Sequence, residues 1–191
     1  MKTTTRIVST AIVTSIMASP ALAHTGAGHT HGLLAGLMHP IGGADHLLAM
    51  LAIGIWSALV MRRLSVWAAP AAFVLAMLAG AGLGVSDIGL PGVETGIALS
   101  VIALGGMILM RVELPVAAGA VLAAVFALYH GYAHGSEATG ALAPYMAGFA
   151  LTTATLHIAG MGLGWLFIRA SYAPRIVGAA IAVFGAYILA A

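Results

Sequence analysis

Apolar runs long enough to cross a lipid bilayer follow one another along almost the whole chain of 191 residues. A transmembrane helix needs about 20 predominantly apolar residues. Charged residues make up only 6% of the chain, against roughly 25% in an ordinary soluble domain. We therefore predict an all-α, polytopic membrane protein with about six transmembrane helices, near residues 44–61, 65–85, 93–110, 114–133, 144–168 and 176–191.

The first 23 residues have the pattern of a cleavable signal peptide. Lys2 and Arg6 form a positively charged start, residues 7–17 an apolar core too short to span, and residues 21–23 a small-x-small cleavage site. We therefore expect residues 24–191 to form a single transmembrane domain in the inner membrane of a bacterium. Because signal peptides are cleaved on the far side of the membrane, the mature N-terminus is expected in the periplasm.

The placement of arginine predicts the same orientation independently. Cytoplasmic loops of membrane proteins collect Lys and Arg, whereas translocated loops do not. With the N-terminus outside, the loops at residues 86–92 and 135–143 are translocated, and they carry Asp87 and Glu137 but no Lys or Arg. The arginines beyond the signal peptide all fall on the cytoplasmic side: Arg62, Arg63, Arg111, Arg169 and Arg175.

The first apolar region, residues 32–61, is longer than one span requires and contains helix-breaking residues. Pro40, Gly42 and Gly43 interrupt it where a continuous helix would be penalised. We predict a re-entrant or kinked lead-in, followed by a spanning helix from about Ala44. Irregular backbone at membrane depth is tolerated only where it faces protein or a cavity.

Histidine and acidic side chains from two distant segments fall at the same end of the predicted bundle. One group lies at the outer end of the first spanning helix and the other at the outer end of the fourth. Each contains a pair spaced i, i+4, His46 with Met50 and His130 with His134, so each pair faces one way. Two such pairs on neighbouring helices can surround one ion. The candidate ligands are His39, Asp45, His46, His130, His134 and, just beyond the helix, Glu137.

The ligand chemistry limits the ion that such a site can take. The chain has no cysteine, which excludes thiolate metal sites. Neutral imidazole with one or two carboxylates suits borderline divalent ions such as Ni, Co, Zn and Cu. Ligand type alone does not choose among these four metals.

Other titratable residues allow two interpretations each. His157 lies deep in the fifth predicted helix, where an ionisable residue marks a pathway for an ion or a proton, although it could instead bond a helix carbonyl. Glu137 could equally be a solvated loop acid. A short polar stretch after the signal peptide could scavenge metal or be a simple tail, and its histidines are His24, His29 and His31.

Three motifs resemble those of a known transporter family. Residues 39–50, HPIGGADHLLAM, resemble the HPxxGxDHxxxM signature of the HupE/UreJ nickel and cobalt permeases. Residues 129–137, YHGYAHGSE, are similar to the second motif of the family, and residues 156–160, LHIAG, to its later histidine-containing helix. The resemblance implies secondary uptake of Ni(II) or Co(II), which are transported substrates rather than permanently bound cofactors. It also implies that metal-binding roles fall on His39, Asp45, His46 and the His130/His134 pair.

Other classes of function account less well for the sequence. A membrane-bound b-type haem protein is the main alternative, since paired histidines on facing helices can be axial ligands. We predict no enzyme activity, because Gly-x-Ser-Gly and His-Glu-x-x-His settings are missing from the sequence. Without a nucleotide-binding motif or a basic tract, neither ATP-driven transport by this chain nor nucleic-acid binding is expected.

Overall fold

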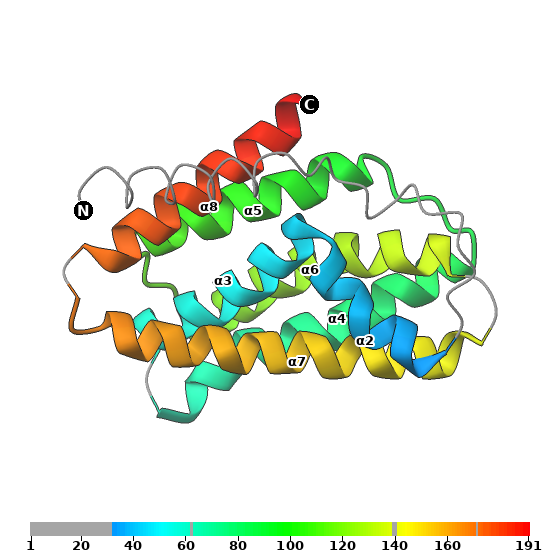
Figure 1. The fold of residues 1–191 in the computed structure, drawn as a ribbon, viewed down its shortest axis with the longest axis horizontal. Helices are drawn as coiled ribbons and strands as arrows, with labels where there is room; N and C mark the ends of the chain where they lie inside the picture. Colours follow the sequence, from blue (N-terminus) through cyan, green and yellow to red (C-terminus); the bar gives the residue numbers. More distant parts are fainter. Residues whose placement is uncertain (1–31, 62, 139–140, 171) are drawn as a thin grey trace, which may run out of the picture.

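The computed structural model describes residues 32–61, 63–138, 141–170 and 172–191, and these residues form helices and connecting turns without a strand (Figure 1). This confirms the predicted all-α class. The elements are α2 (Leu33–Gly42), α3 (Ala44–Val60), the 3-10 helix η2 (Arg63–Trp67), α4 (Ala68–Val85), α5 (Val93–Met110), α6 (Val116–Glu137), α7 (Leu142–Phe167) and α8 (Ala173–Ala190).

Five helical segments in the described residues are long and apolar enough to cross a membrane, and α2 with α3 passes the same test as a bent pair. The described residues thus contain five candidate spans, or six if the α2–α3 pair counts as one span, and the higher number equals the predicted one. The predicted signal peptide, Arg62 and the histidines of the polar stretch (His24, His29 and His31) lie outside the described residues.

The first span is a broken helix. The axes of α2 and α3 differ by 85°, and the break falls at Gly43, whose backbone is extended (φ −103, ψ 118). Pro40, which we expected to contribute to the interruption, lies inside α2 instead. A proline is accommodated there because α2 is short and ends two residues later, so little of the helical hydrogen-bond ladder is lost.

Contacts with α7 show that α2 and α3 together follow one span. A Cβ added at Gly148 of α7 would lie 2.3 Å from the Leu33 carbonyl oxygen of α2, and one added at Gly160 would lie 2.3 Å from the Leu51 carbonyl oxygen of α3. The contacts therefore advance along α7 as the chain advances through α2 and then α3. This order fits a broken span better than a loop that returns to its starting face (Figure 1).

Close approach of glycines to neighbouring backbone holds the helices in pairs. One of the closest examples joins α4 and α6, where a Cβ added at Gly131 would lie only 1.9 Å from the Met77 carbonyl oxygen. α5 and α8 lie side by side in the same way (Figure 1), with Gly178 against the backbone of Leu109. Small residues allow such packing in lipid, where no hydrophobic drive brings helices together.

The arginines of the described residues lie at one end of this bundle. Gly164 of α7 meets Ala58 of α3, so these two helices end together, and the contact of Gly178 with Leu109 brings the start of α8 beside the end of α5. The described arginines lie in η2, directly after α5, directly after α7 and in the first turn of α8: Arg63, Arg111, Arg169 and Arg175. This grouping agrees with the predicted loops, while the side of the membrane remains a prediction.

The predicted helix boundaries are close to those observed, with one difference that affects the site. The fourth predicted span was expected to end at residue 133, but α6 continues to Glu137. His134 therefore lies in the last turn of α6, and Glu137 is its last residue rather than a residue beyond the helix. The apolar pattern stops before the helix does because the last turn is built from His, Gly, Ser and Glu, which hydropathy does not count as membrane-spanning.

Candidate metal-binding site

Four histidine rings form one contiguous cluster, which we call the histidine cluster: His39, His46, His130 and His134. The ring centroids of His39 and His134 lie 4.5 Å apart, those of His134 and His46 4.3 Å, and those of His46 and His130 4.7 Å. The last three side chains are buried, and that of His39 is partly buried. Residues separated by almost a hundred positions in the chain thus meet, as the sequence predicts.

The broken helix explains how α2 and α3 both reach this cluster. His39 lies in the last turn of α2 and His46 in the first turn of α3, on either side of Gly43. In a straight helix, seven residues correspond to about 10 Å of rise. The bend at Gly43 instead allows both rings to contact the single ring of His134.

The carboxylate of Asp45 orients the ring of His46. Its Oδ1 atom accepts hydrogen bonds from His46 Nδ1 at 2.9 Å and from the His46 backbone N–H at 2.8 Å, and the Asp45 residue is only 2% exposed. Because an ionised carboxylate can only accept, Nδ1 carries the proton and the lone pair of the neutral ring is on Nε2. A carboxylate behind a histidine is a common arrangement at metal sites.

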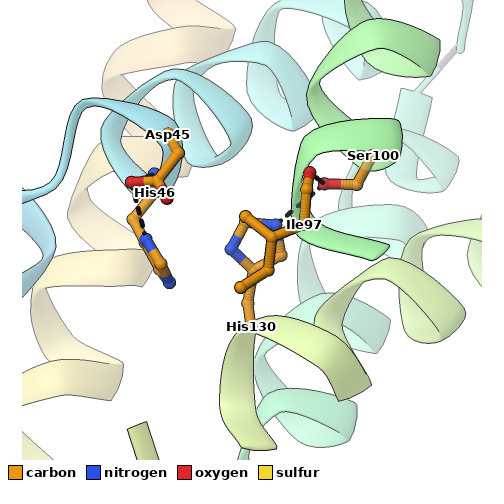
Figure 2. A network of polar contacts seen from close by, with 5 residues as sticks. All are labelled: Asp45, His46, Ile97, Ser100 and His130. Carbon is orange, nitrogen blue, oxygen red and sulfur yellow. Dashed lines mark hydrogen bonds and ion pairs between the residues drawn. The ribbon is translucent and has the colours of Figure 1, made fainter. Parts of the chain in front are cut away.

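A serine from α5, which the sequence analysis did not single out, contacts the opposite side of the cluster. Ser100 Oγ lies 2.8 Å from His130 Nε2 (Figure 2), and both side chains are fully buried. The sequence feature that could have pointed to Ser100 is a hydroxyl in the middle of an apolar span. Its partner could not be predicted, because hydropathy does not show which face of α5 meets α6.

Two phenylalanine rings line the histidines. Phe149 lies 4.2 Å from the His134 ring, and Phe73 lies 5.7 Å from the His130 ring and 5.1 Å from the His157 ring, measured between centroids. Both phenylalanines are fully buried. Phe73 is therefore the side chain that bridges His130 and His157.

His157 is buried past the midpoint of α7, which has 26 residues. Its Nδ1 lies 2.8 Å from the Met50 carbonyl oxygen of α3, so this nitrogen donates. The carbonyl bond that we considered as an alternative is thus present. His157 Nε2 has no hydrogen-bond partner among the described residues, so the side chain keeps a lone pair for a second role.

Comparison with known proteins places the chain in a family. The family model described as HupE / UreJ protein matches residues 12–188. The chain belongs to the HupE/UreJ family. A curated relative, protein HupE of Rhizobium leguminosarum bv. viciae, is 42% identical over 182 residues, which cover 91% of this chain and 93% of the relative. No solved structure matches the chain.

In this HupE/UreJ chain the histidines of the cluster contact one another through their rings. In the described part of the chain, no group of three or more His, Asp or Glu side chains is already arranged to hold a metal ion. Glu137, the last residue of α6, is exposed one turn beyond His134. Its place among the ligands remains a prediction, as do the ligand roles of the other site residues.

Proposed function

We propose that this chain is a permease that carries Ni(II) or Co(II) across the inner membrane of a bacterium into the cytoplasm. The observation that carries the proposal is the mutual contact of four histidine rings inside an apolar bundle. Ionisable side chains are costly at membrane depth and mark ion pathways there. Membership of the HupE/UreJ family supports the same function.

A conducting site must bind its ion well enough to admit it and weakly enough to release it. Rings in edge contact can rotate about their side-chain bonds to bring several nitrogens toward one ion. We infer that metal exchanges some of its waters for these nitrogens and for the Asp45 carboxylate, and that Glu137 assists at the exposed end.

The inward path runs past Phe73 to His157. The Phe73 ring contacts both His130 and His157, so a displacement of this one side chain would connect the cluster with the next nitrogen. His157 lies toward the arginine-bearing end of the bundle. The positive-inside rule makes this end cytoplasmic, and the direction of uptake follows from that orientation.

The haem alternative fits the geometry less well. Axial histidines bind iron on opposite faces of a macrocycle, whereas the neighbouring rings of the histidine cluster contact one another directly with centroids 4.3–4.7 Å apart. A haem plane does not fit between rings in contact. An absorption spectrum of the purified protein decides the point, since a Soret band with stoichiometric haem would contradict the permease.

Uptake of radiolabelled nickel in cells with and without the protein tests the proposal. Cells with the protein should accumulate more nickel, and cobalt should compete more strongly than zinc, copper or manganese. His46→Ala should abolish the difference, whereas Ser57→Ala, which alters a buried side chain of the same helix with no hydrogen-bond partner among the described residues, should preserve it. Equal uptake by His46→Ala and wild type at matched expression would remove the proposed site.

A further inference from the structure

The hydroxyl of Ser100 has its only proton committed. Ser100 Oγ lies 2.6 Å from the Ile97 carbonyl oxygen and 2.8 Å from His130 Nε2 (Figure 2). A carbonyl oxygen cannot donate, and two oxygens at this distance repel unless a proton lies between them. The Ser100 hydroxyl therefore donates to Ile97, as serines in helices often do to a preceding turn.

It follows that Ser100 accepts from His130. Because the hydroxyl has no second proton, the bond to His130 requires a proton on Nε2. A neutral imidazole holds one proton, so Nδ1 of His130 carries the lone pair. That nitrogen is buried and has no hydrogen-bond partner among the described residues.

We propose that Ser100 is a positioning residue that holds His130 in the tautomer with the proton on Nε2, so that Nδ1 faces the incoming metal ion. The metal half of this proposal rests on the proposed function. A histidine that binds metal through one ring nitrogen commonly donates the N–H of its other ring nitrogen to a neighbouring group. Here a serine hydroxyl supplied by a third helix, α5, has that role.

The neighbouring rings of His46 and His130 are protonated on opposite types of ring nitrogen. Asp45 fixes the proton of His46 on Nδ1, whereas Ser100 fixes that of His130 on Nε2. Figure 2 shows one ring nitrogen of His130 on the side toward His46, and the two ring centroids lie 4.7 Å apart in an edge contact with an interplanar angle of 84°. Asp45 and Ser100 thus each hold the protonated nitrogen of one ring, and the lone pair of each neutral ring is on its other nitrogen, which is the atom that binds a cation.

Variants of Ser100 test the role through nickel affinity. Ser100→Ala removes the acceptor, and loss of an outer partner typically lowers metal affinity 10–100-fold. We expect a rise of that size in the KM for nickel uptake and in the dissociation constant of purified protein. Ser100→Thr keeps the hydroxyl and should restore affinity to within a few-fold of wild type. Ser57→Ala is the matched control, because it removes a buried helix hydroxyl that has no hydrogen-bond partner among the described residues.

The tautomer itself can be read without any metal. Solid-state NMR of protein labelled with ¹⁵N-histidine distinguishes protonated from unprotonated ring nitrogens, and the signals of His130 are those lost in His130→Gln. Wild type should show a protonated Nε2 and an unprotonated Nδ1, and Ser100→Ala should show a mixture of tautomers. If Ser100→Ala does not fold, the wild-type spectrum still decides.

The outcomes separate the two proposals. A His130 protonated on Nδ1 in wild type, or a Ser100→Ala protein with the spectrum and nickel affinity of Ser57→Ala, would overturn the role of Ser100 and leave the permease intact. A wild-type protein that shows the expected tautomer but takes up neither nickel nor cobalt would overturn the proposed function and leave only the tautomer assignment.

Discussion

Replacing Gly54 by alanine tests whether the close approach of α3 and α7 is needed for stability and for the position of His157. A Cβ at this position would lie 2.2 Å from the His157 carbonyl oxygen, whereas ordinary van der Waals contact begins at 3.4 Å. The two helices must therefore separate locally by about 1.2 Å. Overpacking of this kind costs about 1–3 kcal/mol, which exceeds the gain of up to about 1 kcal/mol from replacing a helical glycine by alanine.

The same separation affects His157 directly. Its Nδ1 lies 2.8 Å from the Met50 carbonyl oxygen, and a rigid shift away from α3 would lengthen this to as much as about 4 Å, beyond hydrogen-bond distance. Gly54→Ala should therefore lower both the melting temperature in detergent and the rate of nickel uptake.

Gly162→Ala is the matched control for this prediction. It lies on α7 and its added Cβ would meet nothing within 4 Å, so it gains the same helix propensity without overpacking. We expect wild-type or slightly raised stability and wild-type uptake from it. A Gly54→Ala protein as stable and as active as Gly162→Ala would refute the argument that this contact is tight.

Two further predictions follow from the site. Thr152 Oγ1 donates to the Leu37 carbonyl oxygen of α2 at 2.8 Å, so Thr152→Val should destabilise the protein by about 1 kcal/mol and lower uptake by loosening the helix that carries His39. Thr155→Val, which alters an exposed residue of the same helix bonded only within it, should change neither quantity in a thermal-shift and uptake comparison. Protons compete with metal for imidazole, so uptake at fixed external nickel should fall as external pH drops below ~6.5, and a rate independent of pH between about 5 and 8 would contradict ligation by neutral histidine.

The helices were predictable because their signals are local. Apolar runs of spanning length need no knowledge of the neighbours, and each of the six predicted spans contains one of the helices α3 to α8, with α2 as the re-entrant or kinked lead-in expected before the first. The meeting of the histidines was also predictable, because the i, i+4 spacing on α6 and the orientation rule put both groups at one end. The exact position of the break was not, since both Pro40 and Gly43 can end a helix and the local sequence does not choose between them.

The polar partners of the histidines were not predicted from the sequence. Asp45, which directly precedes His46, was named as a candidate metal ligand, and its hydrogen bonds to His46 are seen only in the structure. Ser100 and the Met50 carbonyl act across helix interfaces, and the pairing of α5 with α6 and of α3 with α7 is set by glycine contacts that hydropathy does not encode.

The broken helix also makes the electrostatics of the cluster favourable for a cation. His39 lies in the last turn of α2 and His134 in the last turn of α6, so their contact brings two helix C-termini together. Each C-terminus carries a partial negative charge and carbonyl groups without partners in the helix. The N-terminus of α3, which would repel a cation, has Asp45 in its first turn. A continuous helix through Gly43 would not supply the C-terminus of α2, so the break itself, as well as the histidines, supports the proposal that a positive ion is bound here.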